Sequence, residues 1–208
     1  MPNENYITAS CIISNQVVIK DNELLFENKG TGPAAFLLSV YEHFGISYPK
    51  FYKMDNLSKL GWLAAELLLD KGFQKDKYDA DAIGLVLSNK NSSLDTDIKY
   101  FETVKTIASP ALFVYTLPNI VMGEICIRHQ LKGENAFFIF DSFKPGFIQQ
   151  YVQHLFDTGA VQACICGWVE IMDNAYKAVL YLVEKETGKN AVSFTEENIN
   201  HIYQITNG

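Results

Sequence analysis

Ser142 is the residue of this sequence whose setting best suits a nucleophile. It lies in the stretch AFFIFDSFKPG, residues 136–146, where a short aromatic run, 137–140, ends abruptly at Asp141. The run predicts a buried strand, and Pro145 can open a helix because proline is tolerated in a first helical turn. A strand, a sharp turn and a helix would place Ser142 beside the positive end of a helix dipole, where nucleophiles and anion sites are built.

A serine hydroxyl at such a turn needs an adjacent base before it can attack a substrate. The candidate bases are His43, His129, His154 and His201. His154 is about 18 Å away along a helix, which is too far, and the sequence does not place the other three. Asp141 is expected to point to the opposite side from Ser142 if the strand pleat persists. Serine is also among the best residues at a helix N-cap, and we favour this structural role for Ser142.

The cysteines offer a second kind of chemistry. They are dispersed in apolar segments and are Cys11, Cys126, Cys164 and Cys166. Cys164 and Cys166 could point to one face of a strand and supply two metal ligands, but a second His or Cys pair at a metal-like spacing is lacking. We therefore interpret all four as reduced, buried core residues and expect no metal or other cofactor.

Composition limits the classes of function. The chain has 208 residues, 48% of them hydrophobic, which suits one core and predicts a single domain over 1–208. With 17 basic and 24 acidic residues, it lacks the charge to hold nucleic acid or anionic lipid. The sequence lacks an apolar run near the ~18 residues that span a bilayer. The start, Met-Pro-Asn-Glu, is unlike a signal peptide, so we expect a cytoplasmic protein.

The elements that must position Ser142 form an alternating series. Strands are predicted at 6–14, 82–87, 137–140, 162–171 and 178–184, with a hairpin-like excursion over 16–26. Helices are predicted at 34–44, 57–71, 95–107, 119–129, 145–157 and 194–205. The order predicts an α/β fold with a mixed, mostly parallel five-stranded sheet and helices on both faces. The short connection 172–177 favours an antiparallel pair.

Several separated blocks resemble one family. They are KFYKMDNLSKLGWLAAELLL (50–69), NSSLDTDIKYFETV (91–104), SPALFVYTLPNIVMGEICIRHQLKGEN (109–135) and the weaker GWVEI (167–171). In order and spacing they resemble the amino-terminal half of the β-ketoacyl synthases, the condensing enzymes of fatty acid and polyketide synthesis. Within that family, the blocks most resemble the divergent branch found in bacterial aryl-polyene and flexirubin-type pigment clusters. The resemblance implies half of a thiolase-like fold.

Two departures from the family bear on activity. The family's reactive cysteine sits seven residues after the Asn of a Gly-Pro-Asn segment, and the same count from Asn135 reaches Ser142. Both catalytic histidines of the family come from the carboxy-terminal half, which would begin about where this sequence ends. Phe140 and Phe143 stand where the family has small residues and would narrow an acyl pocket. The resemblance therefore implies a chain that does not condense acyl groups on its own.

The helix predicted at 145–157 divides into two faces. Phe147, Ile148, Tyr151, Val152, Leu155 and Phe156 fill one half of the helical wheel, and Gln149, Gln150, Gln153, His154 and Asp157 fill the other. This suits a half-domain with nothing stacked permanently on it. The glutamine-rich face is either an interface or an ordinary wet surface. The resemblance also implies that the strand carrying Phe137, Phe138 and Phe140 pairs across a dimer axis.

Three functions remain open. The first is a non-catalytic accessory subunit, a pseudoenzyme that binds a full-length ketosynthase, an acyl carrier protein or itself in a fatty acid or polyketide pathway. The second is an acyltransferase that uses Ser142 or a site completed by a partner chain. The third is an acyl-chain binding module, which would need a deep apolar pocket beside residues 137–143. Bulk charge disfavours a carrier protein, because carriers are acidic and so is this chain.

Overall fold

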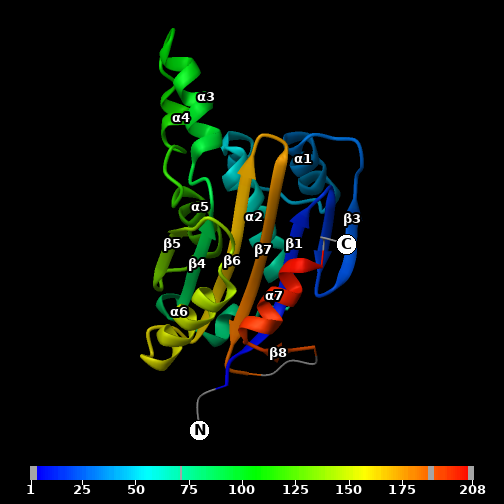
Figure 1. The fold of residues 1–208 in the computed structure, drawn as a ribbon, viewed down its shortest axis with the longest axis vertical. Coiled ribbons are helices and arrows are strands. Elements are labelled where there is room, and N and C mark those ends of the chain that lie inside the picture. Colours follow the sequence, from blue (N-terminus) through cyan, green and yellow to red (C-terminus); the bar gives the residue numbers. More distant parts are fainter. Residues whose placement is uncertain (1–3, 71, 187–189, 206–208) are drawn as a thin grey trace.

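One mixed sheet organises the molecule. The computed structural model describes residues 4–70, 72–186 and 190–205, and within them the strand order is β3-β2-β1-β7-β6-β4-β5, with β8 paired to β1 (Figure 1). The strands are β1 (Tyr6–Ser14), β2 (Val17–Lys20), β3 (Glu23–Glu27), β4 (Ile83–Asn89), β5 (Asn135–Ile139), β6 (Ala163–Met172), β7 (Ala175–Glu184) and β8 (Val192–Ser193). The outermost strands are therefore β3 on one side and β5 on the other.

Helices cover both faces of this sheet. They are α1 (Pro33–His43), α2 (Asn56–Leu69), α3 (Leu94–Val104), α4 (Pro110–Phe113), α5 (Ile120–His129), α6 (Pro145–Asp157) and α7 (Glu196–Gln204), with 3-10 turns at Pro49–Lys53, Lys75–Lys77 and Ala80–Ala82. The helix α2 begins where the sequence predicts, because the Asp55 side chain accepts a hydrogen bond from Ser58 N at 2.9 Å. None of the described helices has the length and apolar character needed to cross a membrane.

The α/β class with helices on both faces is confirmed, but the sheet is larger and less parallel than expected. Only the pairs of β4 with β5 and with β6 are parallel within the described sheet. The pairs of β1 with β2, β7 and β8, of β2 with β3 and of β6 with β7 are antiparallel. The eight strands replace the predicted five, chiefly because the excursion over 16–26 is two further sheet strands.

Two tight turns explain this difference. Asn15 and Gln16 connect β1 to β2, and both have positive φ, +50° and +64°. Asp21 and Asn22 connect β2 to β3 with φ of +49° and +70°. Successive positive φ angles are typical of type I′ turns, whose twist joins adjacent antiparallel strands. The glycine that usually marks such a turn is absent from both. The sequence therefore predicted only a hairpin-like excursion here and not two further strands of the sheet.

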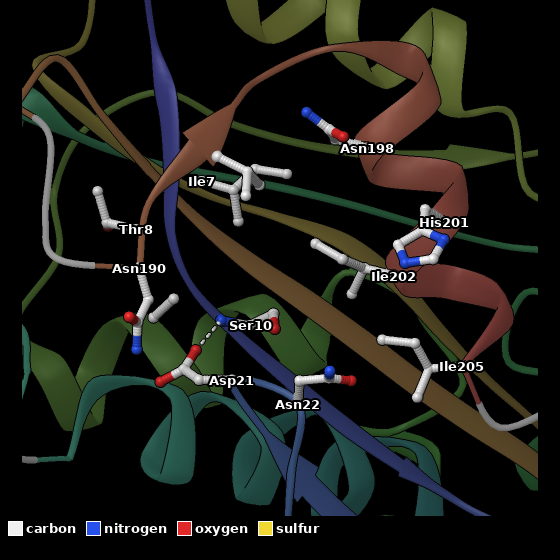
Figure 2. A pocket seen from close by; sticks show the side chains of 12 residues that line it. Ile7, Thr8, Ser10, Asp21, Asn22, Asn190, Asn198, His201, Ile202 and Ile205 are labelled. Carbon is white, nitrogen blue, oxygen red and sulfur yellow. Dashed lines mark hydrogen bonds between the residues drawn. The ribbon is translucent and has the colours of Figure 1, made fainter.

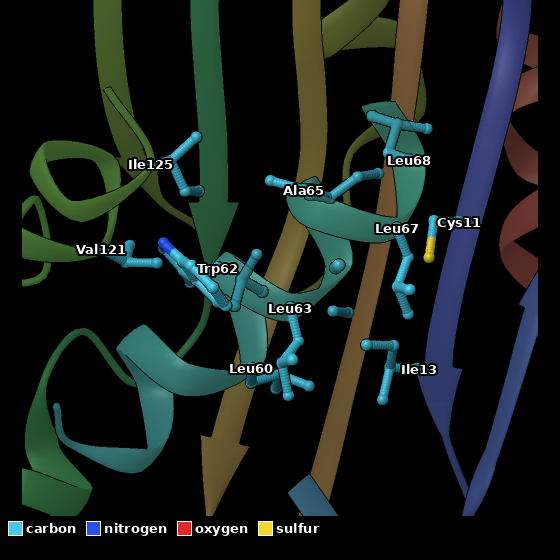
Figure 3. Packing of buried hydrophobic residues seen from close by; sticks show 14 of the residues in the cluster. Cys11, Ile13, Leu60, Trp62, Leu63, Ala65, Leu67, Leu68, Val121 and Ile125 are labelled. Carbon is cyan, nitrogen blue, oxygen red and sulfur yellow. The ribbon is translucent and has the colours of Figure 1, made fainter. Parts of the chain in front are cut away.

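Two hydrophobic cores lie on opposite faces of the sheet. The first is built around α2, with α1 and α5 beside it, and Figure 3 shows Leu67 of α2 on the side of Cys11 and Trp62 on the side of Val121. The second lies beneath α6 and α7 and contains Ile148 and Ile199. Cys164 and Cys166 are fully buried in this second core, so they pack as core residues, as the sequence indicates.

Candidate functional site at the end of strand β5

Ser142 lies just beyond the carboxyl ends of two parallel strands. The strand β5 pairs with β4 in the register Leu85↔Asn135 to Asn89↔Ile139, and the Phe140 amide then donates to the Asn89 carbonyl at 2.9 Å. The chain bends at Asp141 and Ser142 before α6 begins at Pro145. The predicted strand, turn and helix are confirmed, but the expectation of a buried strand is wrong, because β5 lies at the edge of the described sheet and its residues are half-buried or exposed. Loops at the carboxyl ends of parallel strands are where α/β proteins commonly place their sites.

The side chain of Ser142 is exposed and has an acidic neighbour. Its Oγ donates a hydrogen bond to Asp141 Oδ1 at 3.3 Å, and the same oxygen accepts from Lys144 Nζ at 2.7 Å. The Lys144 ammonium lowers the pKa of Asp141, which makes that carboxylate a weaker base. The expectation that Asp141 points away from Ser142 is wrong, because the strand ends at Ile139 and its pleat does not continue through the bend.

The expectation that Ser142 caps the helix is also wrong. The N-cap residue of α6 is Lys144, and no side-chain cap hydrogen bond is made there. Ser142 lies two residues before the cap, and the first turn of α6 carries Pro145, which has no amide hydrogen to donate. The serine therefore does not have the capping role that the sequence suggested for it.

We expect Ser142→Ala to change the free energy of unfolding by less than about 0.5 kcal/mol, because the side chain is exposed and does not cap α6. Urea denaturation would measure this. The control is Asp55→Ala, which removes both the cap of α2 and the acceptor of the Thr96 hydroxyl and should cost about 2 kcal/mol or more. A loss of that size for Ser142→Ala would mean that the serine holds the turn after all.

The histidines lie elsewhere in the structure. His43 packs against Phe26 with the two ring centroids 4.4 Å apart and the rings tilted, and His129 lies 3.4 Å from Glu66 Oε1. His154 is exposed on α6, and His201 is exposed on α7. Within the described residues none of them makes a hydrogen bond or ion pair with Ser142. In the described part of the chain, Ser142 thus has no imidazole as a hydrogen-bond partner.

His129 instead provides a test of pH dependence. Burial lowers its pKa from the ordinary value near 6.5, and this outweighs the nearby Glu66 carboxylate, while Arg128 and Lys75 act in the same direction as burial. Below about pH 6.5 the unfolded chain holds a proton on His129 that the folded chain does not, so stability should rise with pH across this window and fall on acidification. In His129→Gln this slope should become shallower by urea denaturation.

The matched control for that measurement is His154→Gln, because His154 is exposed on α6. The control should keep the pH slope of the wild type. An unchanged slope in His129→Gln would show that the imidazole titrates alike in the folded and unfolded chain.

A carboxylate from α7 stands at the start of α6. A Cβ added at Gly146 would come within 2.7 Å of Glu196 Oε2, so the Glu196 side chain lies against the first turn of α6. Phe143, between Ser142 and the helix, is buried and stacks on Tyr203 of α7 at 4.5 Å. The positive end of the α6 dipole thus already has an anion beside it, which reduces its effect on the Ser142 hydroxyl.

Four rings form an aromatic cluster beside β5: Phe138, Phe140, Phe147 and Tyr151. Phe147 lies 4.8 Å from Phe138 and 4.9 Å from Phe140, and Tyr151 lies 5.0 Å from Phe138. The helical wheel placed Phe147 in the buried half, but its side chain is 39% exposed. The reason is that β5 is the outermost strand, so nothing in the described chain covers the rings from that side.

The other residues named as an interface have different settings. Phe137 points to the opposite face and packs against the first core. Gln149 is half-buried, while Gln150 and His154 are exposed. Gln153 accepts a hydrogen bond from Asn5 Nδ2 at 2.9 Å and donates to Asp157 at 2.8 Å, so it ties α6 to the start of β1.

The apolar pocket that an acyl-chain binding module would need is not evident beside residues 137–143. Four surface hollows of the described chain are lined by residues outside 136–147. One, of about 230 Å³, lies between α7 and β1, where Asp21 accepts from the Ser10 amide and His201 and Ile202 line the opposite wall (Figure 2). The rings near Ser142 pack on each other, which weakens the binding-module hypothesis.

Comparisons with known proteins agree on the fold. No protein-family model and no curated protein matches the sequence. Among solved structures, the ishigamide ketosynthase/chain length factor matches with a TM-score of 0.60 and 17% identity over 87% of this chain and 62% of that chain. A ketosynthase in complex with its type II polyketide synthase acyl carrier protein matches with a TM-score of 0.59 and 14% identity, over 88% and 63%.

A third structure is similar in length as well as in fold. The ketosynthase ApeO in complex with its chain length factor ApeC from Xenorhabdus doucetiae matches with a TM-score of 0.53 and 11% identity, over 89% of this chain and 80% of the matched chain. By contrast, this chain spans less than two thirds of the first two structures. The thiolase-like ketosynthase fold implied by the sequence blocks is thereby confirmed.

Proposed function

We propose that this chain, which has the thiolase-like fold of the ketosynthases, is a non-catalytic accessory subunit that binds a ketosynthase. The pathway would build acyl chains of the fatty acid or polyketide type, with aryl-polyene synthesis as the model case. The observation that carries the proposal is the state of Ser142. By the sequence resemblance it stands at the position of the family's cysteine, yet it is exposed, has a salt-bridged aspartate as its neighbour and makes no hydrogen bond to a histidine of the described chain.

The strand β5 supports binding of another chain. In the described sheet it is an edge strand, and the exposed aromatic ring of Phe147 lies beside it. An exposed strand edge can pair with a strand from another protein. Neighbours in fold include a ketosynthase with its chain length factor and a ketosynthase with its acyl carrier protein. Because both of these similar structures are complexes that contain a ketosynthase, we choose a ketosynthase as the partner.

The first experiment is affinity purification of the tagged protein from its native host, with mass spectrometry of the recovered chains. Recovery of a full-length ketosynthase supports the proposal. The recovered ketosynthase would then be purified and titrated against this chain. Recovery of this chain alone, or as a dimer of itself, would contradict the proposal.

The edge of β5 offers a precise variant. The even-numbered residues bond to β4, since the Glu134 carbonyl accepts from Leu85 and the Phe140 amide donates to Asn89, so the Ile139 amide points outward. Ile139→Pro removes this outward donor and no bond to β4. We expect at least tenfold weaker binding of the purified ketosynthase, whereas Ile139→Ala, which keeps the amide, should bind like the wild type.

The acyltransferase alternative is tested by intact mass. After exposure to acyl thioesters, the wild-type chain should carry no adduct, because a serine without a base is a poor nucleophile. An adduct on the wild type that is missing in Ser142→Ala would establish acylation of Ser142. An adduct that forms only when the ketosynthase is present would indicate a site completed by the partner.

A further inference from the structure

The outer edge of β1 is interrupted between its two neighbours on that side. There β8 pairs with Tyr6 and Ile7, and β2 pairs with residues 11–14. Residues 8–10 lie between these pairings, and the register of β1 against β7 shifts between Ile7 and Ala9. A bulge of this kind bends a strand and is common beside functional sites. The interruption leaves room beside β1 that a continuous sheet would fill.

Two surface hollows meet at this interruption, one at the end of α2 and one beneath α7. Both are lined by Thr8, Ala9 and Asp21. The hollow near α2 is also lined by Lys20, whose ammonium donates to the Asp70 carbonyl at 2.6 Å. The other, which we call the α7 hollow, lies on the opposite face of the sheet and has a volume of about 230 Å³ (Figure 2). The lysine next to Asp21 is therefore directed away from the α7 hollow.

The backbone of β1 holds the Asp21 side chain in place. The Asp21 amide donates to the Ser10 carbonyl at 3.0 Å, and Asp21 Oδ1 accepts from the Ser10 amide at 2.7 Å. Asp21 is nevertheless exposed, and none of the salt bridges among the described residues includes it. A fixed carboxylate without a cationic partner is suited to a positively charged ligand, because little side-chain freedom is lost on binding.

The remaining walls of the α7 hollow are mainly apolar. Ile7 of β1 and Ile202 and Ile205 of α7 supply them, and Figure 2 shows Ile202 reaching from α7 toward β1. Apart from His201, Asp21 is the only ionisable group among the described residues that line the hollow. Apolar walls with a few polar groups are typical of sites for small molecules.

Size and charge together define the class of ligand. The volume of about 230 Å³ exceeds the roughly 150 Å³ of an engineered cavity that binds benzene, and it is smaller than the roughly 300 Å³ at which sites for drug-sized molecules begin. The described lining includes no aromatic side chain, and aromatic rings are what recognise quaternary ammonium groups. The combination therefore favours a primary ammonium group on a short aliphatic chain.

We propose that the α7 hollow binds a small primary alkylamine, with the ammonium group on Asp21 and the aliphatic chain against Ile7 and Ile202. Such an amine is protonated at neutral pH, as the lysine side chain is. This proposal goes beyond the proposed function and does not depend on it, because β7, β6 and β4 separate β1 from the edge strand β5. The purified chain should bind the amine without any partner.

Isopentylamine is the probe, and its binding is followed by nuclear magnetic resonance of the backbone amides. Saturable shifts should appear at Ser10 and Ile202. Asp21→Asn should bind the amine at least tenfold more weakly, while its side-chain oxygen can still accept from Ser10 and asparagine tolerates the φ of +49°. The matched control is Asp173→Asn, since Asp173 is also exposed, has φ of +53° and precedes an asparagine in the turn between β6 and β7. The control should bind like the wild type.

Two further compounds test the ligand class on the wild type itself, so the result does not depend on how a variant folds. Isopentanol replaces the ammonium group by a neutral hydroxyl, and methylamine keeps the charge but lacks the chain. Each should bind at least tenfold more weakly than isopentylamine. Equal binding of isopentanol would overturn recognition of the charge, and equal binding of methylamine would overturn the role of the apolar walls.

The remaining outcomes separate this proposal from the proposed function. Absence of saturable shifts with isopentylamine, or equal affinity in Asp21→Asn and the wild type, would overturn the amine site and leave the ketosynthase partner unaffected. Failure to recover a ketosynthase, with amine binding intact, would overturn the proposed function alone.

Discussion

Gly167→Ala is expected to lower the free energy of unfolding by about 3 kcal/mol or more, a large share of the roughly 5–15 kcal/mol that stabilises an ordinary domain. Gly167 lies in β6 with φ of +150°, and a Cβ there would be 2.0 Å from the Val179 carbonyl oxygen of β7. Because the obstacle is backbone of a paired strand, no side-chain rotation can relieve the collision. Both strands line the two cores, so the effect should reach the whole fold.

Gly123→Ala is the control for this experiment. Gly123 lies in α5, and a Cβ added there meets nothing within 4 Å. Alanine in a helix interior should stabilise the fold by about 0.5–1 kcal/mol relative to glycine. Urea denaturation of both variants gives the comparison. A Gly167→Ala midpoint within experimental error of the wild type would show that β6 and β7 are farther apart in solution.

Much of the fold could be predicted because it depends on local patterns. The apolar run 82–87 predicted a strand, and β4 is present there and buried along its whole length. The helix predicted at 57–71 begins at Asn56, directly after Asp55, which accepts the capping bond. The tight turns at Asn15-Gln16 and Asp21-Asn22 were not recognised from the sequence, because their positive φ angles are adopted here without glycine.

The position of the candidate site between a strand and a helix was predictable, but the residue that caps the helix was not. The strand, turn and helix around Ser142 follow from the aromatic run and Pro145, but the location of the cap at Lys144 depends on how many residues the bend consumes. The orientation of α3, which exposes the apolar Ile98 and Phe101 and buries the polar Thr96, could not be foreseen. A helical period shows that a helix has an apolar stripe, whereas contacts far away in the sequence, such as Thr96 with Asp55, decide which side faces water.

Ile199→Ala is expected to cost about 2–5 kcal/mol, the usual range for truncating a fully buried isoleucine. Ile199 is completely buried in the second core, and its carbonyl accepts a hydrogen bond from the buried Tyr181 hydroxyl at 2.8 Å. Together these contacts hold α7 on the sheet. The exposed Gln204 of the same helix provides the control, because Gln204→Ala should change stability by less than about 0.5 kcal/mol.

A second measurement connects this loss to the candidate site. Tyr203 of α7 stacks on Phe143, and Glu196 of α7 lies against Gly146, so α7 covers the segment that follows Ser142. Loosening α7 should therefore speed amide hydrogen exchange over residues 143–148 while exchange in α2, on the opposite face, changes only as much as global stability does. Equal acceleration on both faces would mean that α7 supports the fold as a whole and does not specifically shield the turn at Ser142.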